Sequence, residues 1–491
     1  MSSLTSQILR SSFLLFLTRL IQRSIGLIST LILARALTPD DFGIVAIAAL
    51  VIHMCEVLSN LGSQQYIIQK DSVTEDDLNS AWTLDLILKT ILWGLLVAVI
   101  PAISSFYDRP ELENALYASS FILIIGALKS PGLILLRKSL QYKPIFTISV
   151  CQKVISFCAV MLIVYYSPSY WALVVGNIVS IITLAIGSYF LHPARPKLCI
   201  QKIWEQWPFS QWVLLKGGVG FTRAQVDTML VSKYFSSEEL GAYHLSRHIS
   251  IMPSTEIIAP AIEPLLVSFA KVKNNARELA YRLSLCLLVV SLLIVPASVF
   301  IWFFPEPIVD FFLGSQWTNT YPLISALSIL LYTIAIGQVL SQCCVALGKV
   351  RSLFIYDLLS LIFIFSLLYL FRNESLHEFA LFRGVLGLIA VIALFIYISR
   401  VSAISISHVI NLIAPTFVSA LASAYITKWL SFNGFGISIV DLALWLLIFG
   451  LIYIFICGFF YLMYCRHIKE WQHLFQILTS FLSKGIKQNN H

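Results

Sequence analysis

The stretch LILARALTPDDFGIVA at residues 31–46 ends one apolar run, crosses a short charged turn and begins a second apolar run. A related stretch, MLVSKYFSSEELGAYH, occupies residues 229–244, so the two align from position 31 to position 229, an offset of 198 residues. The matched positions are Arg35 with Lys233, Thr38 with Ser236, Asp40 and Asp41 with Glu238 and Glu239, and Gly43 with Gly241. One half of the chain therefore looks like a copy of the other, and we call the shared stretch the repeated motif.

The composition indicates a membrane protein. Of the 491 residues 58% are hydrophobic and 12% are charged, and the mean hydropathy is +0.85. Soluble domains carry about 25% charged residues, so this chain is predicted to be a polytopic membrane protein. Its net charge of +8 then reflects topology before it indicates an anionic partner, because Lys and Arg gather in cytoplasmic loops.

The number of apolar runs predicts the number of membrane spans. A bilayer core of about 30 Å needs about 20 apolar residues per helix, and 14 runs of this length fit the sequence. Their centres lie near Ile25, Val51, Trp93, Ile125, Ser156, Ser180, Val219, Pro253, Leu292, Tyr332, Leu361, Ala390, Val418 and Phe449. We expect Pro253 to kink span 8, since proline interrupts helix interiors.

The distribution of positive charge predicts the orientation. An even number of spans puts both termini on one side, where 19 of the 33 Lys and Arg residues fall, against five on the opposite side. Because cytoplasmic loops carry the excess of positive charge, both termini are predicted to be cytoplasmic.

The two copies of the repeated motif lie six spans apart and are predicted to face outward with the same polarity. Such a parallel repeat of six spans is an architecture of secondary transporters, with the substrate site between the halves. The sequence thus predicts an all-α protein with two six-helix bundles related by a pseudo-two-fold axis, plus two carboxy-terminal helices. The expected parts are an amino-terminal bundle (1–191), a cytoplasmic interfacial linker (192–210), a carboxy-terminal bundle (211–400), spans 13 and 14 (401–464) and a cytoplasmic amphipathic tail (465–491).

Aromatic residues support the two surface assignments. Trp204 and Trp207 suit a linker whose indoles lie in the headgroup zone. In the tail, Trp471 and Phe475 belong to a set of apolar residues at helical spacing, which predicts an amphipathic helix on the membrane surface.

The repeated motif has two interpretations. In the first it is structural: an acidic pair after Thr38 or Ser236 caps the next helix and meets its positive dipole end, and Gly43 or Gly241 permits close packing. In the second, the motif forms part of an outer gate. The sequence leaves both open.

Nine Lys and Arg residues remain inside the predicted spans once the 19 and the five are subtracted from the 33. Each would cost about 2.5–3.5 kcal/mol at the bilayer centre, so these side chains must pair, snorkel or line water. Arg19 and Arg23 share a face of span 1 with Gln22 and Gly26, since residues three and four apart are neighbours on a helix. We predict a cytoplasm-facing cationic cavity lined by Arg19, Arg23, Lys89, Lys129, Lys153, Lys216 and Arg223.

Several of these charges have a plainer interpretation. Asp85 and Lys89 are four residues apart, as are Arg223 and Asp227, so both pairs are also candidates for intrahelical ion pairs. Lys153 and Arg383 lie near span ends and can snorkel instead. Intramembrane carboxylates are candidates for ion coupling, and the candidates here are Glu56, Asp85, Asp227 and Glu256.

The sequence offers no catalytic or metal site. Its nine cysteines form no CxxC or Cys/His cluster and are expected to pack as small apolar residues. It contains no Gly-rich phosphate loop, HExxH or GxSxG motif. We therefore expect no enzyme, no cofactor and no metal, and nothing indicates a nucleic-acid partner.

The motif ARALTPDDFG at residues 34–43, the first span with its arginines, and the stretch VDTMLVSKYFSSEELGAYHLSRHISIMPS at residues 226–254 resemble the Wzx-type polysaccharide transporter family. That family belongs to the multidrug/oligosaccharidyl-lipid/polysaccharide exporter superfamily, and the resemblance covers spans 1 to 11. It implies two bundles arranged as a V in the bacterial inner membrane. It also implies a flippase that carries an undecaprenyl-diphosphate-linked oligosaccharide outward for O-antigen, capsule or exopolysaccharide export, with polysaccharide polymerase and chain-length proteins as partners.

Three alternatives remain at this point. A drug exporter of the same superfamily would more naturally show an acidic, aromatic cavity. A peptidoglycan-precursor flippase would share both the spans and the cationic cavity. A membrane polysaccharide polymerase or ligase would need a sizeable outer loop with catalytic groups, whereas the longest outer connection here holds only Glu306 and Asp310.

Overall fold

The computed structural model describes residues 2–70, 72–139, 141–258, 262, 265–270, 272–402, 404–430 and 438–476. All regular secondary structure in these ranges is helical, which confirms the predicted all-α fold, while the pseudo-two-fold repeat stays a prediction. The chain divides into two compact units, Met1–His244 and Leu245–His491. This division falls after the second copy of the repeated motif, whereas the sequence predicted a boundary within the linker at 192–210.

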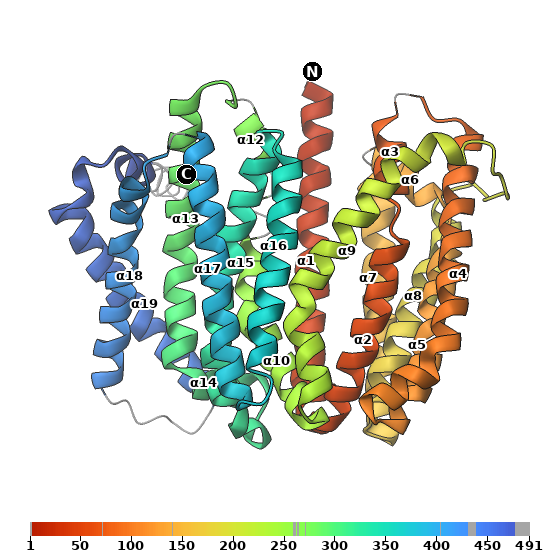
Figure 1. Cartoon of the computed structure of the whole chain (residues 1–491), viewed down its shortest axis with the longest axis horizontal. Helices are drawn as coiled ribbons and strands as arrows, with labels where there is room; N and C mark the ends of the chain where they lie inside the picture. Colours follow the sequence, from red (N-terminus) through yellow and green to blue (C-terminus); the bar gives the residue numbers. More distant parts are fainter. Residues whose placement is uncertain are drawn as a thin grey trace, which may run out of the picture. The chain divides into compact units, whose positions relative to one another are not determined.

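The first unit is a bundle of long helices with two short helices at one end (Figure 1). Its elements are α1 (Ser2–Ala36), α2 (Pro39–Ser59), α3 (Ser63–Gln69), α4 (Glu75–Tyr107), α5 (Pro110–Ala127), α6 (Gly132–Lys138), α7 (Tyr142–Tyr166), α8 (Trp171–Leu191), α9 (Ile203–Tyr234) and the first turns of α10 (Ser237–Pro253). The short helices α3 and α6 pack against each other.

The second unit is also helical and begins within α10. A π-helical turn, η1 (Ser254–Ile258), follows Pro253 directly. The further elements are α12 (Leu265–Ala270), α13 (Ala276–Phe303), α14 (Pro305–Phe312), η2 (Ser315–Thr320), α15 (Tyr321–Ala346), α16 (Val350–Leu370), α17 (Leu376–Ser402), α18 (Ile406–Trp429), α19 (Ser438–Met463) and η3 (Cys465–His467).

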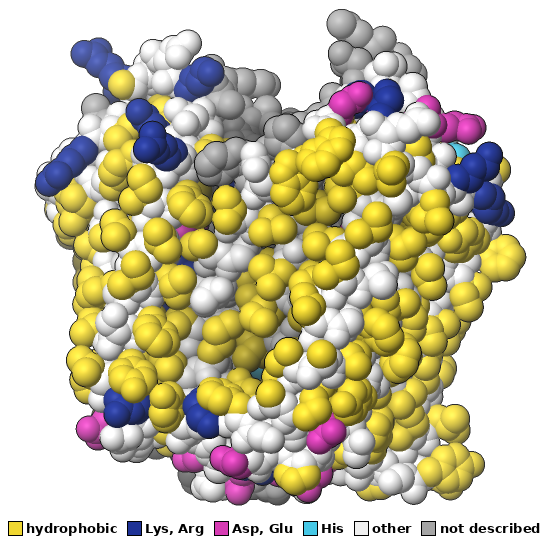
Figure 2. Space-filling view, turned by 45° about the vertical axis from the view of Figure 1, so that its right-hand side comes forward, with side chains coloured by type: hydrophobic (Ala, Val, Ile, Leu, Met, Phe, Trp, Pro, Cys, Tyr) yellow, Lys and Arg dark blue, Asp and Glu magenta, His cyan; other side chains and the backbone are white. Residues whose placement is uncertain are grey.

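The described residues contain 11 helices that are long and apolar enough to cross a membrane, or 12 if α5 and α6, bent by 61°, form one span. The predicted count of 14 is not confirmed. The two remaining predicted spans lie on α9, which carries Lys216, Arg223 and Asp227, and on the 17-residue α10. On the face in Figure 2, hydrophobic side chains cover the middle, and Lys, Arg, Asp and Glu gather towards the two ends.

Both copies of the repeated motif start a helix with the same capping box. In the first copy the Thr38 hydroxyl accepts a hydrogen bond from the backbone N–H of Asp41 at 3.3 Å, and the Asp41 carboxylate accepts one from the backbone N–H of Thr38 at 3.0 Å. In the second copy Ser236 and Glu239 exchange the same two bonds at 3.2 and 2.9 Å. Each box satisfies two N–H groups that the first turn leaves without partners.

The motif glycines bring the two copies into contact within the first unit. A Cβ atom on Gly43 would lie under 3.0 Å from the carbonyl oxygen of Ser237, and one on Gly241 would lie equally close to the carbonyl oxygen of Pro39. Pro39 and Ser237 are matched positions of the repeat, so the contact is reciprocal. Real Cβ atoms essentially never come so close to another heavy atom; both glycines are therefore required by backbone-to-backbone packing.

Further contacts tie the first copy to neighbouring helices. The Asp40 carboxylate pairs with Arg109, just before α5, at 3.3 Å. The Asp41 carboxylate also accepts a hydrogen bond from the backbone N–H of Tyr170, just before α8, at 2.9 Å. These contacts support the structural interpretation of the motif.

The linker predicted at residues 192–210 packs against the beginning of α4. The backbone N–H groups of Lys197 and Lys202 donate to Asn79 and Ser80 at 3.0 and 3.2 Å. The buried Asp77 carboxylate receives Lys70 at 2.6 Å and Lys202 at 3.4 Å. The hydrogen bond to Asp77 raises the pKa of Lys70 above its usual range.

The segment after α19 packs into the second unit. Its helix at residues 469–476 inserts Trp471, which is 4% exposed, among Leu288, Leu412 and Cys465. The Trp471 indole donates to the backbone oxygen of Leu412 at 3.2 Å. The tail was expected to lie on the membrane surface, but here the indole lies against protein because α13, α18 and α19 offer it a closed apolar site. Residues 477–491 of that predicted tail lie outside the described residues.

Candidate functional site

The face of α1 that bears the predicted arginines packs beside α7. Gln22 donates from Nε2 to the backbone oxygen of Ser149 on α7 at 3.2 Å. One turn further along α7, Lys153 places both Cε and Nζ 3.9 Å from the position that a Cβ on Gly26 would take. The Lys153 ammonium therefore lies beside Gly26 of α1, at an ordinary van der Waals distance. We call Arg19, Arg23 and Lys153 the α1–α7 cationic face.

The electrostatics of this face favour an anion. Arg19 and Arg23 are exposed, and Lys153 is partly buried within the electrostatic range of Arg23. The positive charges of Arg23 and Lys153 repel each other, and this repulsion grows as water is excluded from the space between them. A bound anion removes this repulsion, and guanidinium groups offer it a planar fork of donors.

Lys89 and Lys129 form a second group, on α4 and at the end of α5. Lys89 donates to Asp85, four residues earlier, at 2.8 Å, which confirms the intrahelical ion pair. Lys129 lies between α5 and α6, where its backbone oxygen accepts from Trp82 at 3.2 Å, and it is within electrostatic range of Lys89 and Asp85. Asp85 therefore partly neutralises this group.

The cations of α9 lie on a separate face of that helix. Gly217 and Phe221 pack towards α2, against Val57 and His53. Lys216 and Arg223 share a different side, and no heavy atom lies within 4 Å of a Cβ built on Gly220 between them.

Three of the coupling candidates differ in their surroundings. Asp227 is fully buried and accepts a hydrogen bond from Tyr243 on α10 at 2.8 Å, so it serves helix packing. Asp85 pairs with Lys89 as described above. Glu56 pairs with His53 at 3.1 Å, with both side chains about half exposed. The side chain of Glu256 lies outside the described residues.

Glu56 and His53 line a cavity of about 330 Å³ inside the first unit. Its other polar lining residues are Ser119 on α5 and Asn177 and Ser180 on α8. Gln152 on α7 donates to Ser180 at 2.7 Å, which links the cavity wall to the helix that carries Lys153. The sequence analysis missed Asn177, Ser180 and Gln152 because neutral polar residues inside apolar runs give no charge signal.

The remaining candidates are Arg383, possible metal ligands and the cysteines. Arg383 was a candidate for snorkelling, yet it is buried on α17 at 8% exposure, with Nη1 3.3 Å from where a Cβ on Gly387 would lie. In the part of the chain that the structure describes, no group of three or more His, Cys, Asp or Glu residues is placed to hold a metal ion. Burial raises the pKa of the Cys465 thiol to about 11, which makes it unreactive at neutral pH.

Comparison with known proteins assigns the chain to a family. The model of a family described as "Polysaccharide biosynthesis protein" matches residues 32–322. The chain is 22% identical over 310 residues to an uncharacterized membrane protein in the cps region of Klebsiella pneumoniae, covering 62% of this chain and 64% of that protein. It is 19% identical to the lipopolysaccharide biosynthesis protein WzxC of Escherichia coli, covering 66% and 67%. It is 21% identical to the succinoglycan biosynthesis transport protein ExoT of Rhizobium meliloti, covering 61% of each.

The chain thus spans less than two thirds of the length of the Klebsiella protein and of ExoT. Among solved structures, the lipid II flippase MurJ in an inward closed conformation superposes with a TM-score of 0.71 at 17% identity, covering 92% of this chain and 99% of MurJ. An inward-facing multidrug transporter of the MATE family gives 0.60 at 14% identity, covering 79% and 98%. These likenesses establish a shared fold.

Proposed function

Because the chain belongs to the family of polysaccharide biosynthesis proteins, we propose that it is a flippase for an undecaprenyl-diphosphate-linked oligosaccharide. It carries this lipid from the cytoplasmic to the outer leaflet of the bacterial inner membrane by alternating access, with both termini in the cytoplasm. The names of WzxC and ExoT, which refer to lipopolysaccharide biosynthesis and to succinoglycan transport, support this substrate class.

The observation that carries the proposal is the α1–α7 cationic face. Two exposed arginines and a partly buried lysine lie together on apolar helices. Holding such charges in hydrocarbon costs several kcal/mol in total, so their presence favours an anionic ligand. A diphosphate meets this need, since guanidinium groups bind phosphate oxygens bidentately and replace part of the hydration shell.

The repeated motif supplies a second element of the mechanism. The backbone contact between the start of α2 and the start of α10 is too close to admit any side chain. We assign it a structural role: it holds the start of α2 against the start of α10, in line with the contacts of the first copy to Arg109 and Tyr170. Release of the headgroup on the outer side requires weaker binding in the outward state, which a gradient of ions or of voltage supplies.

Glu56 is the carboxylate that we assign to ion coupling. It lies in a polar cavity with His53, so protonation of the carboxylate changes the charge of the pair. Replacing Glu56 by Gln should make transport insensitive to a proton gradient while leaving substrate binding unchanged. Transport by Glu56→Gln that still follows the proton gradient contradicts this assignment.

The test of the proposed function is mass spectrometry of lipid-linked oligosaccharides from cells with and without the protein, combined with a leaflet-accessibility assay. Accumulation of completed repeat units on the cytoplasmic leaflet in its absence supports the flippase and identifies the glycan. Accumulation of single units on the outer leaflet contradicts it and indicates a polymerase or ligase. Accumulation of a peptidoglycan precursor, or of no lipid-linked sugar, contradicts the oligosaccharide substrate and leaves the other transporters of the fold.

A further inference from the structure

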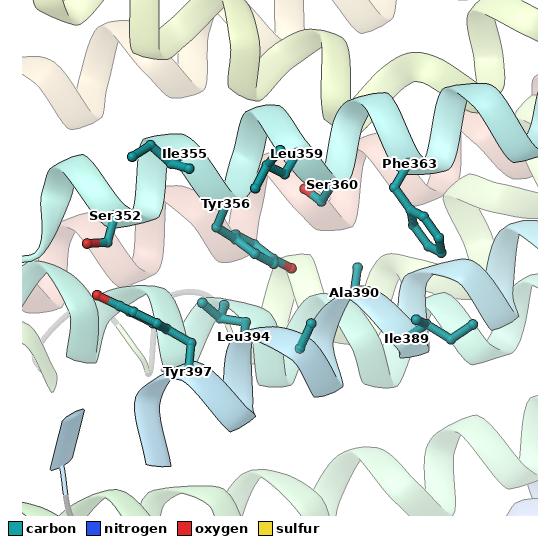
Figure 3. Close-up of a pocket in the computed structure, with 11 residues that line it drawn as sticks. Ser352, Ile355, Tyr356, Leu359, Ser360, Phe363, Ile389, Ala390, Leu394 and Tyr397 are labelled. Carbon is teal, nitrogen blue, oxygen red and sulfur yellow. The ribbon is translucent and has the colours of Figure 1, made fainter. Parts of the chain in front are cut away.

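A groove of about 560 Å³ lies between α16 and α17 in the second unit (Figure 3). It arises because α16 is supported on one side only. The buried residues of α16 form a single stripe of Leu353, Ser360, Ile364 and Leu368. Beside that stripe, Ile355, Leu359 and Phe363 stand 45%, 60% and 37% exposed. The α17 side offers the small side chains of Ala390 and Ala393, which leave the hollow open.

The groove changes from polar to apolar along its length. Figure 3 places the hydroxyl groups of Ser352 and Tyr397 at one end and Phe363 and Ile389 at the other. Ser352 lies in the first turn of α16 and Tyr397 near the last turn of α17, so the polar end belongs to the helix termini at one membrane face. The apolar end reaches towards the middle of the membrane.

Three positively charged residues lie close in the sequence to the polar end of the groove. Lys349 and Arg351 flank the start of α16, and Arg400 follows Tyr397 by three residues on α17. All three are exposed. These three cations would attract an anion bound at the polar end. Apolar packing of α16 against α17 does not by itself require positive charges at this place.

The length of the groove identifies the kind of chain that fills it. From Ser352 to Phe363 the helix rises about 16 Å, at 1.5 Å per residue. One leaflet of a bilayer core contributes about 15 Å, half of the total of about 30 Å. The groove thus matches an acyl chain that ends at mid-membrane, whereas a polyprenyl chain is far longer than one leaflet is deep.

We propose that the α16–α17 groove binds an anionic glycerophospholipid of the leaflet next to the polar end. One acyl chain lies between α16 and the alanines of α17, and the phosphate lies among Lys349, Arg351 and Arg400. This lipid is distinct from the transported substrate and supports α16, whose own packing stripe is narrow. The site does not depend on the proposed function.

Native mass spectrometry of the purified full-length protein tests the site, with phosphatidylglycerol, phosphatidylethanolamine and a polyprenyl phosphate as probes. The wild type should retain one phosphatidylglycerol in preference to phosphatidylethanolamine. Ala393→Phe fills the groove and should lower this retention at least about tenfold, the effect of losing roughly two buried methylene groups. Arg351→Gln/Arg400→Gln should abolish the preference for the anionic lipid without filling the groove.

Two control variants keep the test specific. Val385→Phe adds the same ring to an exposed position of α17 outside the groove, and Arg372→Gln removes a cation beyond the opposite end of α16. Both should behave like the wild type. Retention of phosphatidylglycerol by Ala393→Phe at wild-type level overturns the proposal. So does a result in which polyprenyl phosphate displaces phosphatidylglycerol from the wild type and Ala393→Phe alters only the polyprenyl lipid. The arginine variants change exposed side chains, so they remain informative if Ala393→Phe fails to fold.

Discussion

The contact between the two motif copies and the α1–α7 cationic face lie in the same unit and obey opposite physical requirements. At the motif contact, two helix starts approach so closely that a single methyl group on Gly43 or Gly241 would collide with backbone. At the cationic face, the arginines are exposed and Lys153 lies beside Gly26 at an ordinary van der Waals distance. Backbone packing requires glycine in the first region, whereas charged side chains define the second. The comparison separates residues needed for folding from residues available for a ligand.

The largest effect is expected at the cationic face. Arg19→Gln/Arg23→Gln should lower transport by about a hundredfold or more, because two hydrogen bonds to a charged group are worth about 1.5–3 kcal/mol each. Protein abundance and the melting temperature should stay within error of the wild type. The assay is the leaflet distribution of the lipid-linked oligosaccharide.

The matched control for that variant is Lys197→Gln/Lys428→Gln, which removes the same number of charges from exposed positions outside α1 and α7. It should transport normally. Full activity of the arginine variant, or equal loss in both, would remove the cationic face from the substrate path.

The next effect is expected at the motif contact. Gly241→Ala should destabilise the protein by about 3 kcal/mol, the upper part of the range for overpacking, since the carbonyl of Pro39 cannot move aside as a flexible side chain can. Thermal unfolding in detergent measures it. Gly94→Ala on α4, where a Cβ meets nothing within 4 Å, should be neutral or slightly stabilising. Equal melting temperatures for the two variants would show that the close approach does not exist.

A smaller effect is expected from the capping boxes. Thr38→Ala and Ser236→Ala should each cost about 1 kcal/mol of stability, as is usual for the loss of a helix cap. Thr147→Ala, whose hydroxyl bonds only to its own helix, should cost less. If only one of the two cap variants lowers the melting temperature, the two copies of the motif are not equivalent.

The smallest effect concerns Lys89, which lies outside both regions and tests whether the second cationic group is structural. A double-mutant cycle with Asp85→Asn and Lys89→Gln should give a coupling of about 0.5 kcal/mol in thermal unfolding, as for an intrahelical pair. Transport by the double variant should exceed that of Lys89→Gln alone, because the single change leaves Asp85 without its partner. Strictly additive effects would instead assign Lys89 to the substrate path.

The sequence determined the features that depend on neighbours along the chain or on composition. Apolar runs fixed an all-helical membrane protein, Thr38 and Ser236 marked helix starts, and the spacing of Asp85 and Lys89 gave their ion pair. Such local features follow from helical periodicity and capping chemistry. Spacing also put Arg19, Gln22, Arg23 and Gly26 on one helix face. It did not show which helix packs against that face.

Only the tertiary structure decided which surfaces come together. It paired Gly43 with Ser237 and Gly241 with Pro39, put Lys153 beside Gly26, and gave Asp227 to Tyr243. It also buried the indole of Trp471 within the second unit and left a groove beside Ala393. Each of these depends on the distance between residues on different helices, and hydrophobic periodicity carries no information about which helices become neighbours.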